Sequence, residues 1–503
     1  MHDAFRHGRR SRSAPPRASA MVEALRGLGY SPATAIADII DNSIAAGASA
    51  VDLDFVWSGE DSFITILDNG RGMDEQALDR AMRLGERSPL EDRNAEDLGR
   101  FGLGLKTASF SQARRLTVAS RQEGGEVLAL HWDLDVLRDD PAGAWALLEG
   151  AAEGSQERLA ALEALPSGTL VLWELMDRIV PSGVREQDFL DLIDRIEQHL
   201  AMVFHRFIEK RRLTIRINGR AIAAWNPFLE HRSDTWRSGT DTFLVNGSPV
   251  SVEGFVLPHR DRLDAKTRDS AAGPDGWTAQ QGFYVYRNER LLVAGHWLGL
   301  GKGRGWTKDE PFRLARIRLD LPNSADADWK IDIRKSTARP PVEARMRLSV
   351  FAEDVRDRAR KVFAFRGKPQ ATGARSPVVQ AWRADRLTGG VRYRIDADHP
   401  AVAAVLEHAG PLKADIEAML AVIEATVPVQ QIWLDTAEAK DTPKAAPDGP
   451  PTEAERRMLE TVFRNLVSRK GYSIEQARNK LRSSEPFDAW PDLIDTLVPT
   501  PSE

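Results

Sequence analysis

The chain reads Asp38-Ile39-Ile40-Asp41-Asn42, then Asp68-Asn69-Gly70-Arg71-Gly72-Met73, then Gly99-Arg100-Phe101-Gly102-Leu103-Gly104. The first stretch is predicted to lie on a helix from about Pro32 to Ala46, because Ser31 is a natural N-cap and Gly47 suits the residue past the end. At about 100° per residue the isoleucines face one side of this helix, and Asp38, Asp41 and Asn42 face the other. Alone, such an Asp-x-x-x-Asn pair is more typical of a solvated helix face, so the other two stretches decide its meaning.

The second stretch begins where a strand is predicted to end. Residues 51–55 alternate between apolar and polar side chains, and the β-rich run at residues 62–67 stops at Asp68. Gly70 and Gly72 permit backbone turns through which a ligand ring can approach the main chain, while the Asp68 carboxylate accepts a hydrogen bond. The alternative interpretation is an ordinary Asn-Gly turn between two elements.

The third stretch is a glycine-rich loop that runs into a predicted helix start at residues 105–110. It is not a Walker A loop, because Leu105 separates Gly104 from Lys106, and it is not a dinucleotide fingerprint, because Thr107 stands at the third-glycine position. The free N–H groups and the positive dipole end of such a helix suit phosphate. Together the three stretches predict one nucleotide-binding site.

These motifs, in this order, resemble those of the GHKL ATPase superfamily, which groups gyrase B subunits, heat-shock chaperones, histidine kinases and MutL mismatch-repair proteins. The loop at residues 99–104 resembles the chaperone and MORC version, and residues 42–48 resemble the MutL version. This mixture is similar to bacterial MutL/MORC-like ATPases of restriction and phage-defence gene clusters. The resemblance implies an α+β chain with a Bergerat-type α/β sandwich ATPase domain, a transducer-like α/β domain and a mainly helical C-terminal region.

The resemblance also implies a role for particular residues, with ATP and Mg²⁺ as cofactors. Asp38 matches the general base that activates the attacking water, Asn42 the Mg²⁺ ligand and Asp68 the partner of the adenine amino group. Relatives usually carry glutamate at the position of Asp38, and aspartate is one methylene shorter, so slow hydrolysis and binding without hydrolysis are both open. The other nucleotide-binding residues implied are Gly70, Gly72, Met73, Gly99, Gly102, Leu103, Gly104, Lys106, Thr107 and Thr169.

A second domain is predicted from residue 211 to 365, opening with a strand and turn at residues 215–220. Residues 282–292 and 329–335 alternate like further strands. The resemblance implies that this transducer-like domain returns a lysine to the γ-phosphate. Lys335 is the candidate and Lys330 the alternative, and an exposed strand-end lysine is the competing interpretation of both.

Composition divides the rest of the chain. Stretches rich in arginine, serine, proline or alanine predict disorder or linkers. The last stretch combines basic and apolar positions, which suits either a phosphate-backbone contact or a solvated face on a helical bundle. The predicted parts are a disordered basic arm at residues 1–19, the ATP-binding domain at 20–210, the transducer-like domain at 211–365, a linker with a small α/β or helical segment at 366–433, a second linker at 434–452, and a helical module at 453–503.

Length and composition bound the interpretation. A chain of 503 residues with 42% hydrophobic content supports about three domains with real cores. The absence of cysteine excludes disulfides and cysteine-based metal or redox sites. Apolar runs are too short for a bilayer, so a cytoplasmic protein without membrane contact is expected. The net charge of −5 argues against a surface coated for nucleic acid, although a local basic groove is compatible with it.

The predicted function is an ATP-hydrolysing conformational switch that closes as a homodimer around bound ATP. It is expected to act in DNA processing or anti-phage defence, with duplex DNA and a helicase-like or nuclease protein encoded nearby as partners to test. One alternative is a nucleotide-dependent scaffold without turnover, which the shorter Asp38 favours. Another is a heat-shock-type chaperone, which the glycine loop favours but which the missing long acidic linker opposes.

Overall fold

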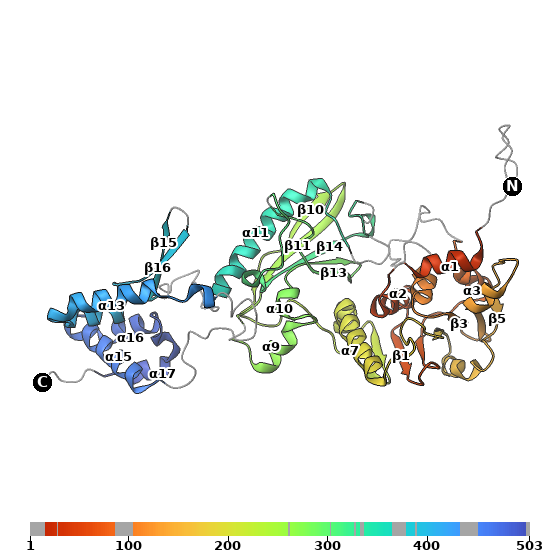
Figure 1. Cartoon of the computed structure of the whole chain (residues 1–503), viewed down its shortest axis with the longest axis horizontal. Helices are drawn as coiled ribbons and strands as arrows, with labels where there is room; N and C mark the ends of the chain where they lie inside the picture. The colour runs from red at the N-terminus through yellow and green to blue at the C-terminus, as the bar shows by residue number, and fades with distance from the viewer. Residues whose placement is uncertain are drawn as a thin grey trace. The chain divides into compact units, whose positions relative to one another are not determined.

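The computed structural model describes residues 16–27, 29–85, 104–259, 262–301, 303–325, 328–331, 337–364, 379–387, 390–432 and 451–498. The chain divides into two compact units, Met1–Gly367 and Lys368–Glu503. Figure 1 shows the helices and strands of both units, which make this an α+β protein.

An eight-stranded sheet builds the first half of unit one, in the order β5-β4-β3-β6-β2-β1-β7-β8. Its described pairs are antiparallel except for β1 and β7, which run parallel. The strands are β1 (Ala50–Val56), β2 (Phe63–Asp68), β3 (Arg115–Arg121), β4 (Leu128–Asp133), β5 (Leu148–Glu149), β6 (Gly168–Glu174), β7 (Thr214–Ile217) and β8 (Arg220–Ala221).

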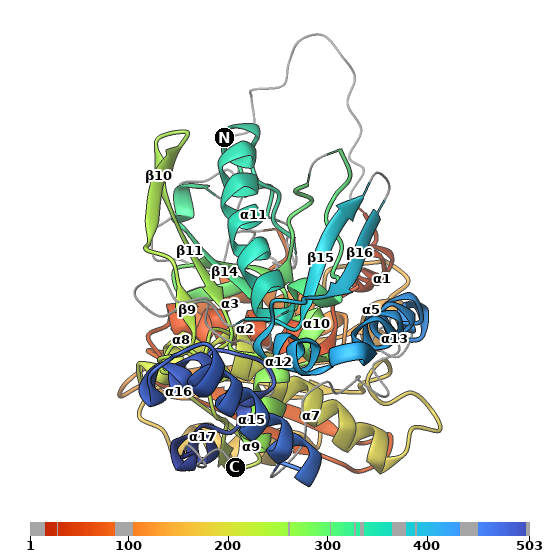
Figure 2. The same ribbon diagram turned by 90° about the vertical axis from the view of Figure 1, so that its left-hand side faces the viewer.

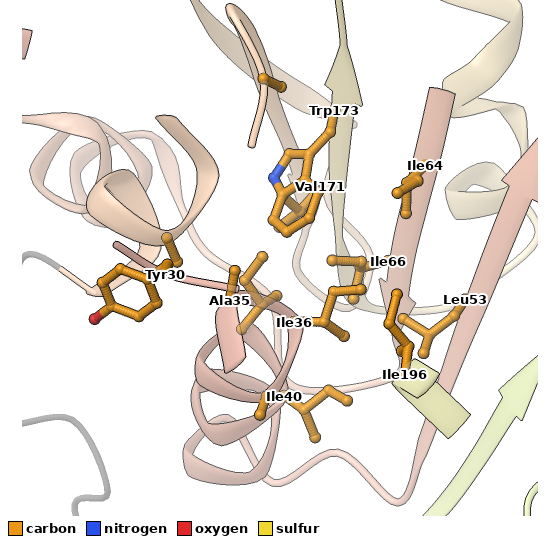
Figure 3. Close-up of a cluster of buried hydrophobic side chains, with 14 of the residues drawn as sticks. Tyr30, Ala35, Ile36, Ile40, Leu53, Ile64, Ile66, Val171, Trp173 and Ile196 are labelled. Carbon is orange, nitrogen blue, oxygen red and sulfur yellow. The ribbon is translucent and has the colours of Figure 1, made fainter. Parts of the chain in front are cut away.

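Helices cover one face of this sheet, and α2 (Pro32–Ala45) lies at the centre of that layer. Its predicted N-cap is confirmed, because the Ser31 hydroxyl accepts a hydrogen bond from the Thr34 N–H at 3.2 Å. Figure 3 shows the α2 isoleucines Ile36 and Ile40 packed toward the strands, and each is fully buried. Such burial stabilises the fold by about 1.5–3 kcal/mol per side chain. The other helices are α1 (Ala18–Arg26), α3 (Glu75–Met82), α4 (Gly104–Phe110), α5 (Leu134–Asp139), α7 (Glu186–Val203) and α8 (His205–Glu209).

Both faces of the sheet are covered, as the alternation along β6 shows. Val171 and Trp173 belong to the core under the helices, whereas Leu170 and Leu172 belong to a smaller cluster on the opposite face. That cluster includes side chains from the 3₁₀ turn η1 (Gln156–Leu159) and from α6 (Ala160–Glu163). Because successive side chains of a strand point to opposite faces, the alternation also fixes which face each polar residue joins.

A second sheet completes unit one, in the order β10-β11-β14-β12-β13, with β9 paired to β11. One face packs against α11 (Val342–Ala364), which lies along β11 and β14 (Figure 1). The opposite face carries Tyr284 and Tyr286, which cluster with Met202 and Trp225 from the first half of the unit. The elements are β9 (Trp236–Arg237), β10 (Asp241–Val245), β11 (Ser248–Val256), α9 (Ala265–Ala272), α10 (Gly276–Ala279), β12 (Gly282–Arg287), β13 (Arg290–His296) and β14 (Ala315–Leu321).

Three sequence-based expectations change here. The strand expected to open the second domain instead extends the first sheet, because β7 pairs in parallel with β1. Residues 328–330 form a turn rather than a strand, and Lys330 has a φ of 47°. The predicted disordered arm lies outside the described residues up to residue 15, but Ala18 already begins α1.

Unit two joins the two C-terminal pieces that the linker at residues 434–452 was expected to separate. Its elements are the hairpin β15 (Trp382–Leu387) and β16 (Gly390–Ile395), then α12 (Pro400–His408), α13 (Lys413–Ala425), α15 (Glu453–Arg464), α16 (Ile474–Arg482) and α17 (Pro491–Thr496). Figure 2 shows α15, α16 and α17 grouped together. Ala401 and Ala404 of α12 share one core with Leu459, Val462 and Leu481, so the two pieces fold together.

Among the described residues, none of the helices combines the length and the apolar character needed to cross a membrane.

Candidate nucleotide-binding site

Asp68 ends β2 and points toward α2. It shares the strand face of Ile64 and Ile66, both of which lie in the core under the helices. The carboxylate is 6% exposed and accepts hydrogen bonds from the Ser43 hydroxyl at 2.7 Å and from the Gly70 N–H at 2.8 Å. Each carboxylate oxygen therefore has a protein donor, and the carboxylate keeps acceptor capacity for a ligand.

Burial raises the pKa of Asp68, because desolvation disfavours its charged form. The hydrogen bonds from Ser43, from Gly70 and from the Thr169 backbone oppose this shift and lower the pKa. Sequence reasoning missed Ser43, although it directly follows Asn42 in the first motif. Its role depends on α2 lying over the end of β2.

A polar row crosses three strands beside Asp68. Thr169 of β6 pairs with Asp68, and Ser120 of β3 pairs with Thr169. The Ser120 and Thr169 hydroxyl oxygens are 2.9 Å apart, and Ser120 also accepts a hydrogen bond from the Met73 N–H at 2.9 Å. The row places Thr169 next to Asp68, as expected, and adds Ser120, which the sequence did not single out.

The two glycines of the second motif approach neighbouring backbone closely. Gly72 has a φ of 67°, and a Cβ there would lie 1.9 Å from the Arg121 carbonyl oxygen. A Cβ at Gly70 would lie 2.9 Å from an Asp68 carboxylate oxygen. The Gly70 carbonyl also accepts a hydrogen bond from Ser167 at 2.9 Å. Side chains at these positions would displace the turn, which accounts for both glycines structurally.

Asp38 lies one helical turn before Asn42 on α2 and is 5% exposed. Its Oδ2 atom accepts a hydrogen bond from the Tyr30 hydroxyl at 3.1 Å, and a Cβ at Gly104 would lie 3.9 Å from the same oxygen. Asn42 is exposed. The structure thus brings Asp38 to the start of α4, where the glycine-rich loop ends.

Asp41 shows that the polar side of α2 is not a solvated face. It is 1% exposed, and its carboxylate lies 3.2 and 3.3 Å from the Arg290 Nε atom at the start of β13. The Arg290 Nη2 atom lies 3.8 Å from Asp38 Oδ1. Burial and the charge of Arg290 lower the pKa of the nearby His199 on α7 to about 4. The sequence analysis also missed Arg290. Its only signal in the sequence is that a charged residue begins a mostly apolar strand.

The remaining predicted residues divide into two groups. Gly99, Gly102, Leu103 and Lys335 lie outside the described residues. Lys106 and Thr107 are buried on α4, and the Lys106 ammonium donates to the Ala81 carbonyl at 2.7 Å. This contact ties α4 to the last turn of α3, where a positive charge complements the helix dipole.

The basic residues of the C-terminal module make contacts within unit two. Arg457 pairs with Glu453 at 3.2 Å, Lys470 pairs with Glu407 at 3.0 Å, and Arg482 pairs with Asp495. Arg478 donates to the Leu497 carbonyl at 2.7 Å. These contacts account for several of the charges as parts of a folded helical unit.

A family comparison identifies the first half of unit one. Residues 30–162 match the family described as histidine kinase-, DNA gyrase B-, and HSP90-like ATPase. This segment is a GHKL-type ATPase domain. The match spans all the site residues above that precede residue 162, from Tyr30 to Ser120, and it agrees with the family that the three motifs predicted.

The proteins to which this chain is similar share low sequence identity with it. The chain is 30% identical over 177 residues to the DNA mismatch repair protein MutL of Rhodospirillum rubrum, covering 35% of this chain and 24% of that protein. It is 29% identical over 269 residues to MutL of Shewanella piezotolerans, covering 52% of this chain and 39% of that protein. The ATPase morc-1 of Caenorhabditis elegans is 29% identical over 93 residues, which cover 18% of this chain and 10% of that protein. The chain thus matches well under half the length of each of these proteins.

Proposed function

We propose that this chain is an ATP-binding and slowly ATP-hydrolysing conformational switch of the MutL/MORC-like type. The observation that carries this proposal is the presence of two buried carboxylates, Asp38 and Asp68, in a GHKL-type domain. Asp68 is held by Ser43 and Gly70, and Asp38 lies at the start of α4. In this proposal Asp68 recognises the base, and Asp38 acts at the terminal phosphate.

Recognition of adenine rests on Asp68. Its free acceptor capacity suits an amino group, and the turn at Gly70 and Gly72 fixes the backbone beside it. Asn42 is exposed one turn beyond Asp38 and supplies an amide oxygen for Mg²⁺. Because Mg²⁺ keeps several waters and takes the rest of its ligands from nucleotide phosphates, one or two protein oxygens suffice.

Hydrolysis rests on Asp38 as the group that orients the attacking water. Phosphoryl transfer depends mainly on positioning and charge neutralisation, so a carboxylate at the right distance is sufficient. Gly104 places no side chain between Asp38 and the end of the glycine-rich loop. Lys335 is the proposed γ-phosphate sensor of the second domain, with Lys330 as the alternative.

A scaffold that binds ATP without appreciable turnover is the second candidate. Two observations favour it: the side chain at position 38 is an aspartate, and its oxygens already lie near Tyr30 and Arg290. In such a scaffold these contacts occupy the carboxylate, which then orients no attacking water.

The output of the switch is proposed to be exerted on DNA through ATP-dependent dimer closure. Its support is that the MutL relatives are DNA mismatch repair proteins and that the alignment with one of them extends over 269 residues. A role in anti-phage defence, with a helicase-like or nuclease partner, remains a prediction. A phage-infection assay of cells that carry this gene and its neighbours tests it.

The deciding experiment measures phosphate release by the purified chain with and without duplex DNA, beside binding of a fluorescent ATP analogue. Asp38→Ala should lower turnover about 100-fold or more while binding persists, whereas Asp68→Ala should lose binding. Asp61→Ala, an exposed carboxylate in the turn before β2, is the matched control and should behave as wild type. Binding without turnover above Asp38→Ala would make the scaffold the better account, and absence of binding would reject both.

A further inference from the structure

Arg290 joins the second sheet to the helix that carries the proposed general base. It is 4% exposed at the start of β13. Its Nε atom contacts Asp41, its Nη2 atom faces Asp38 at 3.8 Å, and its Nη1 atom donates to the Leu291 carbonyl at 2.8 Å. All three nitrogens of the guanidinium therefore have an assigned partner or neighbour.

The two aspartates share one side of α2 because they are three residues apart. Both are at least 95% buried, and so is the arginine. A buried charge without a partner costs several kcal/mol, so two carboxylates and one guanidinium must be held in one arrangement. The shorter contacts of the guanidinium go to Asp41, and Asp38 lies at its edge.

The turn that carries Arg290 is anchored from the other side as well. Glu289, the residue before it, pairs with Lys210 at 2.8 Å and with Arg212 at 2.7 Å, both of which follow α8. The β12–β13 turn is thus held between α2 and the segment after α8. A planar guanidinium held at both the backbone and Asp41 has little freedom to move relative to Asp38.

We propose that Arg290 is a positioning residue for hydrolysis, which sets the orientation of Asp38 through its contacts with Asp41 and Asp38. Turnover then requires the start of β13 to pack against α2, so this contact makes the rate of hydrolysis depend on the second sheet. This inference rests on the proposed role of Asp38 as the base that orients water.

The test compares Arg290→Met with Arg290→Lys and measures kcat, KM and the Kd of a fluorescent ATP analogue in the full chain. Misplacement of a catalytic group by about 1 Å costs about 100-fold in rate, so Arg290→Met should lower kcat by that factor while Kd changes less than about threefold. Arg290→Lys should keep only part of the wild-type kcat, because one ammonium group cannot reproduce the contacts of the Nε and Nη2 atoms together. Asp41→Asn should also lower kcat. In the double variant its effect should not add to that of Arg290→Met.

Arg347→Met is the matched control, since Arg347 of α11 forms an Arg–Asp pair with Asp241 of β10 at 2.7 Å. It should keep wild-type kcat. Equal kcat in wild type and in both Arg290 variants would overturn the inference, and so would a parallel loss of kcat, nucleotide affinity and thermal stability in both variants. If the kcat of wild type does not exceed that of Asp38→Ala, the proposed hydrolysis is wrong and the inference fails with it. Because this comparison does not involve the Arg290 variants, it distinguishes that failure from a failure of the inference alone.

Discussion

Replacing Ser43 by alanine tests whether Asp68 is the recognition group. The change removes the 2.7 Å hydrogen bond to Asp68 Oδ2 at a position that is 2% exposed, where water cannot replace it. A hydrogen bond to a charged group is worth about 1.5–3 kcal/mol. If all of it supports ligand binding, the Kd for ATP rises by about one to two powers of ten.

The pH dependence gives the sharper result. Burial raises the pKa of Asp68, and the Ser43 hydrogen bond is the strongest of the interactions that lower it again. Binding needs the ionised carboxylate, so it is present above the pKa in the folded protein and is lost as pH falls through it. Ser43→Ala should therefore move this loss to higher pH.

Binding of a fluorescent ATP analogue, titrated from pH 8 down to about pH 5, measures both effects. Ser109→Ala is the control, because Ser109 is fully buried in the same core layer and its hydroxyl has no partner among the described residues. Its removal should leave Kd unchanged. A Ser43→Ala protein with wild-type Kd at every pH, or with its midpoint at lower pH, would refute the assignment of Asp68.

Three further outcomes are expected. Gly72→Ala should destabilise the protein by about 2 kcal/mol or more, because it adds a clash with the Arg121 carbonyl to the cost of a positive φ. Gly59→Ala, with a φ of 60° and open space around it, should show only the backbone cost of about 1 kcal/mol, and urea unfolding separates the two. His199 is held neutral with its pKa lowered to about 4 from 6.5. Its contribution to stability is therefore present above pH 6.5 and lost as pH falls toward 4, so His199→Gln should flatten the fall of the urea midpoint in that window. Burial raises the pKa of Asp68, so ionisation of this group lowers the free energy of unfolding as pH rises through that pKa. Asp68→Asn removes the charge, so the variant should have a higher melting temperature than wild type at neutral pH, measured by calorimetry. It should also bind ATP more weakly in the binding assay.

The sequence by itself determined the local elements that carry the site. The cap at Ser31 and the end of β2 at Asp68 lie where local signals predicted them, and α4 begins at Gly104, one residue before the predicted helix start. Such signals depend on caps, turns and the period of apolar residues within one segment, so they need no knowledge of distant partners. The order of the three motifs was enough to identify the family.

Only the tertiary structure decided which side chains support the site. Ser43 and Ser120 became part of it through the seating of α2 over β2 and through the β3–β6–β2 register. The parallel pairing of β7 with β1 likewise moved the expected second-domain strand into the first sheet. Arg290 is 249 residues from Asp41 in the chain, yet their side chains meet in the core. Contacts of this kind depend on which faces two distant elements bury against each other, and no local pattern in either segment contains that information.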